Sequence, residues 1–377
     1  MRSLSFKIIA RDPASKARTS IIKTPHGAVA TPAFVPVGTQ ATVKALTARQ
    51  LEELGVPMLM MNTYHLFLRP GAELIADHGG LHRFMGWNRP IMTDSGGFQL
   101  FSLGKNGKGK SLVDISDEKI VFRSHIDRSA HEFTPERSVR IQEKLGADLI
   151  FALDECLPFA ADEAAARASM ERTHRWAERC VAAKKRKEQA LFGIVQGGRY
   201  KELRQQSAAF ISSLPFAGYG IGSIFGEPKK ETQNVLRWTM DALPDSKPVH
   251  LLGIGAVDDL FMGVGQGADL FDCVLPTRLA RVGYIFSSEC RKRKRWRYRV
   301  TNSAFKADAR PLDKDCGCYV CTNCSRAYVH HLFKANELLA YTLATYHNLA
   351  FFSNLMASIR GAITNDSLSK LKKRWLR

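Results

Sequence analysis

A single carboxylate, Asp272, interrupts the short apolar run Leu270–Leu275. Pro276 follows, and because proline cannot donate a hydrogen bond into a sheet, we expect a strand to end here. Burying an unpaired carboxylate is costly, so Asp272 should either have a hidden partner or be kept available for reaction. A lone aspartate is more often a capping or salt-bridged residue. Its context must therefore decide between a structural role and that of a nucleophile.

That context is a series of apolar runs, each followed by polar residues. Eight strand-like runs occur, mostly with helical stretches between them, and this pattern predicts a (β/α)₈ TIM barrel. The runs are Phe34–Val37, Met58–Met61, Ile91–Thr93, Leu149–Leu153, Leu191–Val195, Tyr219–Ile221, Val249–Leu252 and Ala268–Phe271. The polar residues at or just beyond their C-terminal ends are Asn62, Asp94, Asp154, Gln196, Gly222, Gly253 and Asp272. Such barrels build active sites at these ends, so we expect one shared pocket.

Four cysteines within nine positions, Cys316, Cys318, Cys321 and Cys324, predict a metal site. Three thiolates with this spacing and a distant imidazole form a closed tetrahedral Zn²⁺ site of structural type. The residues alone leave the fourth ligand open among Cys324, His330, His331 and His347.

The charge balance points to a polyanionic partner. The 377 residues carry 55 Lys and Arg against 36 Asp and Glu, a formal net charge of +19, which favours nucleic acid over a small neutral substrate. Seven of the nine residues in Arg291–Arg299 are basic. Such a run is usually a solvated face, but the alternation of Arg295, Arg297 and Arg299 suits a strand with one cationic side along a phosphate backbone. The sequence shows no secretory signal or membrane-spanning run, so we expect a cytoplasmic enzyme.

Several segments together resemble the tRNA-guanine transglycosylases, the enzymes of queuosine modification, in their single-chain bacterial form. The segments are Thr93-Asp-Ser-Gly-Gly-Phe-Gln99, Leu153-Asp-Glu-Cys156, Ile194-Val-Gln-Gly-Gly198, Phe271-Asp-Cys-Val-Leu-Pro-Thr-Arg278 and the cysteine cluster. The resemblance extends from about residue 31 to about residue 356. It implies that Asp272 is the nucleophile, that Asp94 is the general acid and base, and that His347 completes the zinc site.

The resemblance also implies a set of binding residues. Asp154 would accept from guanine N1–H and the exocyclic amine, while Gln196 and nearby backbone groups would read O6. The implied substrate-binding residues are Ser95, Gly96, Gly97, Phe98, Asp154, Gln196, Gly222, Ser223, Leu252 and Gly253, with Phe98 stacking on the base. The implied RNA contacts are Gly253, Ile254, Gly255, Ala256, Val257, Asp258, Asp259, Thr277, Arg278, Leu279, Ala280 and Arg281, to which the basic run adds Arg295, Arg297 and Arg299.

In the implied reaction, Asp272 attacks the ribose C1′ of the target nucleotide, and guanine leaves with a proton from Asp94. A free 7-deazaguanine base then displaces the aspartyl ester, so two inversions give net retention. For the bacterial form the incoming base is 7-aminomethyl-7-deazaguanine, the target is wobble position 34 of tRNAs with GUN anticodons (Asp, Asn, His, Tyr), and the protein is a homodimer.

One loop departs from the bacterial pattern. The segment Gly222-Ser-Ile-Phe-Gly-Glu227 is one residue shorter than in typical bacterial members, and it would face the 7-substituent of the incoming base. Direct use of queuine is therefore an alternative. A noncatalytic RNA-binding subunit and a sugar-cleaving barrel glycosidase are two further alternatives. The pair Asp94 and Asp272 argues against the former, while the basic run and zinc loop argue against the latter.

The predicted organisation has four parts. Residues 1–30 form an antiparallel cover of two strands, Leu4–Ile9 and Thr19–Lys23, 31–290 form the barrel, 291–360 a zinc-binding and RNA-contacting subdomain, and 361–377 a basic tail. Within the barrel, Thr134-Pro-Glu-Arg137 predicts a helix start and Gly146 its end. The long segment 95–133 predicts an inserted hairpin over the barrel mouth.

Overall fold

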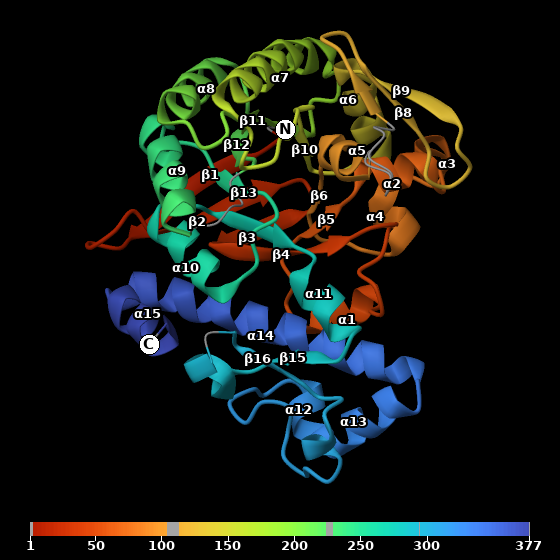
Figure 1. Cartoon of the computed structure of the whole chain (residues 1–377), viewed down its shortest axis with the longest axis vertical. Coiled ribbons are helices and arrows are strands. Elements are labelled where there is room, and N and C mark those ends of the chain that lie inside the picture. Colours follow the sequence, from red (N-terminus) through yellow and green to blue (C-terminus); the bar gives the residue numbers. More distant parts are fainter. Residues whose placement is uncertain (1–2, 104–112, 224–228, 294, 377) are drawn as a thin grey trace.

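A closed barrel of eight parallel strands forms the centre of the protein (Figure 1). The computed structural model describes residues 3–103, 113–223, 229–293 and 295–376. The strands follow one another around the barrel in chain order: β4 (Ala33–Gly38), β5 (Leu59–Met61), β6 (Ile91–Thr93), β10 (Leu149–Phe151), β11 (Ala190–Val195), β12 (Gly218–Ile221), β13 (Val249–Leu251) and β14 (Leu270–Cys273). Each overlaps one of the eight predicted runs, so the predicted barrel is confirmed.

Helices cover the outside of the barrel. They are α1 (Ala48–Glu53), α2 (Thr63–Leu68), α3 (Ala72–Asp77), α4 (Gly80–Met85), α6 (Pro135–Leu145), α7 (Glu163–Ala183), α8 (Lys201–Ser213), α9 (Lys229–Ala242), α10 (Val257–Gly265) and α11 (Leu275–Ala280). The start of α6 matches the sequence prediction, because the Thr134 hydroxyl accepts from the backbone N–H of Arg137 and Pro135 occupies the first turn. Gly146 ends it with a left-handed φ of 74°.

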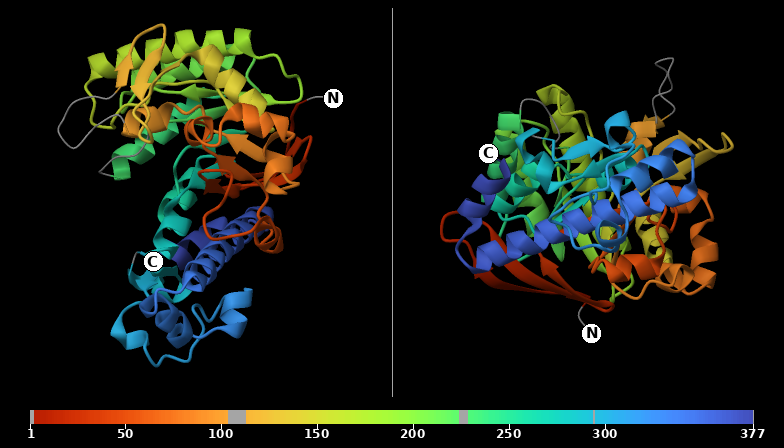
Figure 2. Two further views of the ribbon diagram at one scale, coloured as in Figure 1. Left: turned by 90° about the vertical axis from the view of Figure 1, so that its right-hand side faces the viewer. Right: turned by 90° about the horizontal axis from the view of Figure 1, so that it is seen from below.

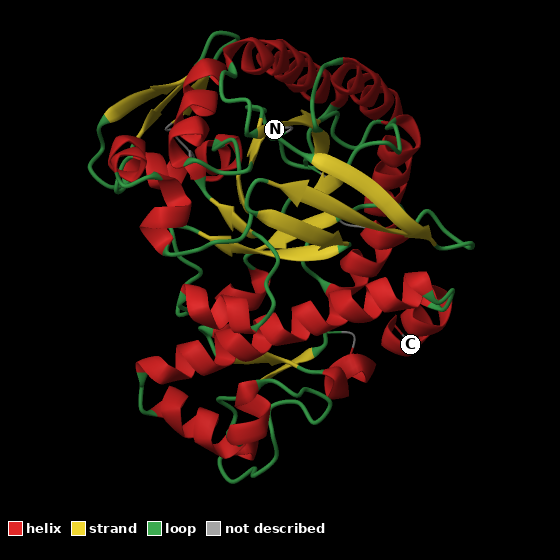
Figure 3. Cartoon of the chain, turned by 180° about the vertical axis from the view of Figure 1, so that it is seen from behind, coloured by secondary structure: helices red, strands yellow, loops and turns green. Residues whose placement is uncertain are grey.

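The N-terminal sheet closes one end of the barrel. It has three antiparallel strands, β1 (Ser5–Arg11), β2 (Arg18–Thr24) and β3 (Gly27–Thr31). Two strands were expected, and the third is short and alanine-rich, with little β propensity. Ile22 and Val29 are fully buried and join the cluster of side chains inside the barrel. This N-terminal sheet, hereafter the floor sheet, therefore closes one end of the barrel core, as Figure 3 shows from behind.

Buried polar contacts fasten this cover to the barrel. Arg18 pairs with the fully buried Asp269, just before β14, at 2.6 Å. At a second point the ring Nδ1 of His26 lies 2.8 Å from Asp148, whose carboxylate also accepts from the backbone N–H of Ile91. His82 stacks on His26, and these two histidines with Asp148 also have the spacing of a metal-ligand group. Because the carboxylate is already supplied with donors, we interpret this group as a hydrogen-bonded clamp.

The insertion after β6 forms more structure than the predicted hairpin. It contains α5 (Gly97–Leu103) and a three-stranded antiparallel sheet of β7 (Val113–Ile115), β8 (Ile120–Arg123) and β9 (Ala130–Phe133). The alternating run at β8 supplies the central strand, and Ile120, Phe122 and Phe133 are buried. The apolar side of this sheet packs against the barrel. This packing stabilises the sheet, since a lone hairpin would be only marginally stable in water.

The C-terminal part forms a lobe beside the barrel (Figure 2). It comprises β15 (Tyr284–Phe286), η1 (Ser288–Arg293), β16 (Arg297–Arg299), η2 (Ser303–Phe305), α12 (Tyr319–Asn323) and α13 (Arg326–Lys334). The long helix α14 (Leu338–Thr364) runs between this lobe and the barrel. Part of the stretch expected as a basic tail forms α15 (Leu368–Leu376), whose Trp375 is buried.

Candidate active site

Asp272 occupies the penultimate position of β14 and is partly exposed. Its Oδ1 accepts from Nε2 of His250 at 2.8 Å and from the backbone N–H of Gly253 at 3.0 Å. His250 is fully buried on the neighbouring strand β13. Among the contacts of the described residues, Oδ2 of Asp272 has no hydrogen-bond donor. One oxygen is therefore fixed and the other is available to a ligand.

Asp94 follows β6 and receives three donors. Thr63 donates its backbone N–H at 2.8 Å, and the side-chain amides of Asn62 and Gln99 donate at 2.5 and 2.8 Å. Burial nevertheless raises the pKa of Asp94 to about 6, and the nearby charge of Asp272 contributes in the same direction. A carboxyl group with such a pKa can both give and take a proton near neutral pH.

Asp154, after β10, forms the third acidic position. Its Oδ2 accepts from Nε2 of Gln196 at 2.7 Å and its Oδ1 from the hydroxyl of Ser95 at 3.1 Å. Burial raises the pKa of Asp154 to about 6. Gly97 lies against this residue so closely that an added Cβ would come within 2.5 Å of the Asp154 carbonyl oxygen. A glycine at position 97 is therefore required for the loops after β6 and β10 to approach each other.

The remaining predicted base-binding residues surround these acids. Phe98 has 55% of its surface exposed, so its ring is accessible for stacking on a base. Ser223 is buried, with its hydroxyl 3.1 Å from the thiol sulfur of Cys156. Its φ of 54° is unusual for a residue other than glycine. Of the shortened loop after it, residues 224–228, including Phe225, lie outside the described residues.

The predicted RNA-contacting residues differ in accessibility. Arg278 and Gly253 are exposed, and Arg281 is partly buried with Nη1 bonded to the Thr277 carbonyl. Asp258 and Asp259 both pair with Lys229. Several others are buried, so at these positions the side chain supports the loop: Ile254, Val257, Thr277 and Ala280. The remaining predicted RNA-contacting residues, which are buried or partly buried, are Gly255, Ala256 and Leu279. The remaining predicted base-binding residues are also buried or partly buried, and they are Gly96, Gly222 and Leu252.

The basic run forms the edge of a two-stranded sheet. Strand β16 pairs antiparallel with β15, and both Arg297 and Arg299 lie over the Tyr284 ring. Tyr298, between them, is buried, and its hydroxyl donates to the Leu312 carbonyl. The alternation predicted from the sequence therefore places the arginines on one side, and Arg295 is exposed just before the strand.

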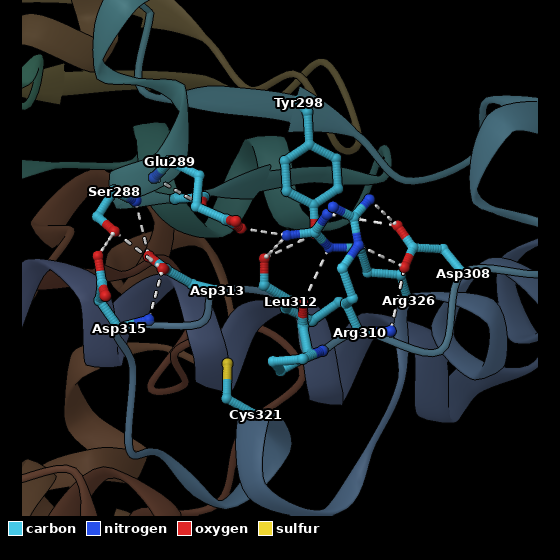
Figure 4. A network of polar contacts seen from close by, with 12 residues as sticks. Ser288, Glu289, Tyr298, Asp308, Arg310, Leu312, Asp313, Asp315, Cys321 and Arg326 are labelled. Carbon is cyan, nitrogen blue, oxygen red and sulfur yellow. Dashed lines mark hydrogen bonds and ion pairs between the residues drawn. The ribbon is translucent and has the colours of Figure 1, made fainter.

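A polar network fastens this segment to the rest of the lobe (Figure 4). Arg326, nearly buried, pairs with Glu289 of η1 and with Asp308, and its guanidinium lies over the Tyr298 ring. Ser288, next to Glu289 in η1, donates its hydroxyl to Asp313. The start of the basic run is thus held in place by buried contacts of the lobe.

Cys316, Cys318, Cys321 and His347 come together as a candidate metal centre. Their ligand atoms all lie within 4.8 Å of one another. Nδ1 of His347 is 3.2 Å from the Cys321 sulfur, while its Nε2 donates to the Phe286 carbonyl at 2.7 Å. This hydrogen bond leaves Nδ1 free as a ligand, as is usual for metal-binding histidines. Three thiolates and one imidazole fit Zn²⁺.

The other three ligand candidates are set apart from this centre. The His330 ring donates to the Val300 carbonyl, His331 is exposed, and Cys324 does not belong to the cluster. The choice of His347 among the four alternatives therefore agrees with the geometry.

Three residues important for the site's geometry were not predicted from the sequence. Gln99 supports Asp94, His250 holds Asp272, and Arg204 lies under the loops after β11 and β12. A histidine inside the apolar run Val249–Leu252 was a usable signal, since a buried polar side chain needs a partner. Gln99 and Arg204 lie in helical stretches, where polar residues are ordinary.

Known proteins resemble this chain over nearly its whole length. Residues 12–377 match the family model described as Queuine tRNA-ribosyltransferase. Proteins named queuine tRNA-ribosyltransferase from Halothermothrix orenii and Thermoanaerobacter sp. (strain X514) are 48% and 49% identical over 376 and 379 residues, covering 100% of this chain and 98% of each relative. A protein of the same name from Herpetosiphon aurantiacus is 49% identical over 362 residues, which cover 96% of this chain and 89% of the relative. In the described ranges, no helix combines the length and apolar character needed to cross a membrane. The match over nearly the whole chain shows that this protein belongs to the queuine tRNA-ribosyltransferase family, the tRNA-guanine transglycosylases.

Proposed function

We propose that this enzyme exchanges guanine at the wobble position of GUN-anticodon tRNAs for a 7-deazaguanine base through a covalent aspartyl intermediate. The observation that carries this proposal is the pair of carboxylates at the barrel mouth, with Asp272 held by one oxygen and Asp94 partly buried near it with a raised pKa. The two groups have different environments and can therefore take different roles.

Asp272 is the proposed nucleophile. The two donors at Oδ1 keep the carboxylate in one orientation and leave Oδ2 to attack C1′ of the ribose. A pre-oriented nucleophile saves orientational entropy at the reacting carbon. The bond from C1′ to guanine N9 breaks as the ester bond from C1′ to Oδ2 forms.

Asp94 is the proposed proton carrier. The pKa of about 6 means that a protonated fraction is available to the leaving guanine, which departs as a neutral base. The resulting carboxylate then removes a proton from the incoming base, which attacks C1′ and releases Asp272. The proton balance closes over one cycle, so no other co-substrate is required.

Recognition of the base is assigned to the pair Asp154 and Gln196. An ionised Asp154 accepts from the two adjacent N–H groups of guanine, and the Gln196 amide together with backbone N–H groups near Ser223 suits the O6 acceptor. Phe98 supplies the exposed ring for stacking. A 7-deazaguanine presents the same edge, so one pocket serves both bases.

The lobe is assigned to tRNA and to structural zinc. Arg295 and Arg299 are exposed and Arg297 is partly buried, and these arginines at the β15–β16 sheet, together with the net charge of +19, suit a phosphate backbone. Zn²⁺ at the Cys316 cluster would join the loop to α14 through His347 and stabilise the lobe. Four large exposed apolar side chains in this region, which support a homodimer, are Tyr319, Tyr328, Leu338 and Leu339.

The incoming base is proposed to be 7-aminomethyl-7-deazaguanine, the base implied by the resemblance of the sequence to the bacterial form of the family. The shortened loop makes queuine the second candidate. Competition of the two bases at equal concentration for guanine-containing tRNA distinguishes them. Incorporation of the aminomethyl base is the expected result, and exclusive use of queuine contradicts the base assignment while leaving the exchange reaction in place.

A further inference from the structure

Arg204 of α8 is a fully buried cation whose described hydrogen bonds all go to backbone carbonyl oxygens. Nε donates to Gly198 at 2.7 Å, Nη1 to Gly222 at 2.9 Å and to Val195 at 3.2 Å, and Nη2 to Ser223 at 3.1 Å. These four carbonyls belong to the ends of β11 and β12 and the loops that follow them. One guanidinium therefore joins the two segments that carry Gln196 and Ser223.

The charge of Arg204 has no acidic counterpart in the described ranges, where no carboxylate lies within ion-pair distance of it. Burial lowers the pKa of Arg204 to about 9, so the side chain remains a cation at neutral pH. A buried charge is tolerated only when its donors are satisfied. The positions of the four carbonyls are consequently coupled to the guanidinium.

Ser223 shows what this coupling achieves. Its φ of 54° lies in the left-handed region, which is unfavourable for a residue with a side chain. The carbonyls of Gly222 and Ser223 belong to the two peptide groups on either side of the Ser223 Cα, and Arg204 binds both. Fixing both peptide planes fixes the backbone angles between them.

The orientation of these planes has a chemical consequence. A trans peptide directs its C=O and N–H to opposite sides. Because the Gly222 carbonyl faces Arg204, the N–H of Ser223 faces away from the guanidinium. A buried donor beside the Gln196 segment is what the O6 acceptor of a guanine requires.

We propose that Arg204 is a positioning residue for base recognition, which holds the Gly222–Ser223 peptide so that its N–H is presented to O6 of guanine or a 7-deazaguanine. Arg204 acts through the backbone and does not touch the base. This inference rests on the proposed function and adds to it the group that sets the pocket's geometry.

The test uses labelled-guanine exchange into tRNA by the full-length, zinc-containing enzyme. Arg204→Lys keeps the charge but replaces the planar fork with a single ammonium, which cannot span four carbonyls. We expect KM for guanine to rise about ten-fold or more in Arg204→Lys, with a smaller change in kcat and with tRNA affinity within about two-fold of wild type. Arg204→Met should raise KM further, and if it does not fold, Arg204→Lys carries the test.

Lys201→Met is the matched control, since it removes an exposed cation three residues earlier in the same helix. It should leave KM, kcat and tRNA affinity unchanged. A merely structural role for Arg204 would lower the active fraction, so that kcat fell while KM stayed constant, and that result overturns the inference. A wild-type KM in Arg204→Lys also overturns it. Failure of the wild-type enzyme to exchange guanine would instead refute the proposed function.

Discussion

At the scale of single residues, the local environment of each acid decides its proposed role. Asp272 is held at one oxygen by a histidine and a backbone N–H, whereas burial raises the pKa values of Asp94 and Asp154 to about 6. The sequence indicated which aspartates follow strands, because periodicity marks strand ends. His250 was recognisable in the sequence as a buried polar residue that needs a partner, but neither its pairing with Asp272 nor the contacts of Arg204 with the loops after β11 and β12 could be predicted, because they join residues that only the closed barrel brings together.

His250 is expected to orient the nucleophile. His250→Phe removes the donor to Asp272 and should slow formation of the covalent tRNA adduct by roughly 10- to 100-fold, since the fixed orientation is lost. His250→Gln retains a donor and should lose less. The measurement is the single-turnover rate of adduct formation, with tRNA affinity determined in parallel. Wild-type rates in His250→Phe would remove this role.

Affinity for the free base should depend on pH through Asp154. Because its pKa is raised to about 6, the carboxylate that accepts two N–H groups is present above pH 6 and is lost as the pH falls through this value. We expect KM for guanine to rise about ten-fold in total between pH 7 and pH 5, since only about a tenth of Asp154 remains ionised at pH 5. The check is KM measured across this range alongside tRNA affinity. A KM that is flat or falls toward pH 5 contradicts the assignment.

At the scale of elements, regular segments were predictable and insertions less so. The eight barrel strands and the capped helix α6 follow from apolar runs and from Thr134, Pro135 and Gly146. The third strand of the floor, β3, was missed because its alanines resemble a loop, and its position is fixed by Val29 packing inside the barrel. The predicted hairpin has a third strand, β7, and the apolar side of the resulting sheet is buried against the barrel.

The cysteine loop is expected to depend on its metal. Cys318→Ser should remove the zinc and lower the thermal stability of the lobe, because a structural site contributes binding free energy to folding. Cys324→Ser is the matched control and should retain one zinc per chain. Metal analysis with thermal unfolding makes the comparison. Loss of zinc in the Cys324 variant alone would overturn the ligand set.

The β15–β16 sheet is expected to contact phosphates. Replacing Arg295, Arg297 or Arg299 singly by Gln should weaken tRNA binding and reduce the slope of log affinity against log salt by roughly one unit per lost contact. Arg11→Gln, on the floor sheet at the other end of the barrel, provides the control. Equal slopes in wild type and all three variants would show that the basic run does not contact phosphates.

At the scale of the whole molecule, the candidate active site and the N-terminal sheet lie at opposite ends of the barrel. The three acids lie at the C-terminal ends of β6, β10 and β14, and the N-terminal sheet closes the other end of the barrel. The C-terminal lobe, to which the basic run and the cysteine cluster belong, extends alongside the barrel (Figures 1 and 2). Net charge and cysteine spacing in the sequence predicted the partner class and the metal. The relation of the lobe to the barrel was not predictable, because it depends on the packing of α14.

Association of two chains is expected to use the exposed apolar side chains of the lobe. Leu338 has 79% of its surface exposed, so Leu338→Glu should shift the chain from dimer toward monomer without unfolding it. Ile9→Glu is a matched control on the floor sheet, where the side chain is 53% exposed. Light scattering at several concentrations gives the mass. A dimer that persists in Leu338→Glu while Ile9→Glu dissociates would place the interface elsewhere.

The proposed covalent bond between Asp272 and the tRNA can be tested by trapping the adduct. Wild-type enzyme mixed with guanine-containing tRNA should give a protein–RNA species that survives denaturation and disappears when free base is added. Asp272→Asn nearly preserves the shape of the side chain but removes the nucleophile, so it should bind tRNA and give no such species. A denaturation-resistant adduct formed by Asp272→Asn would show that Asp272 is not the nucleophile.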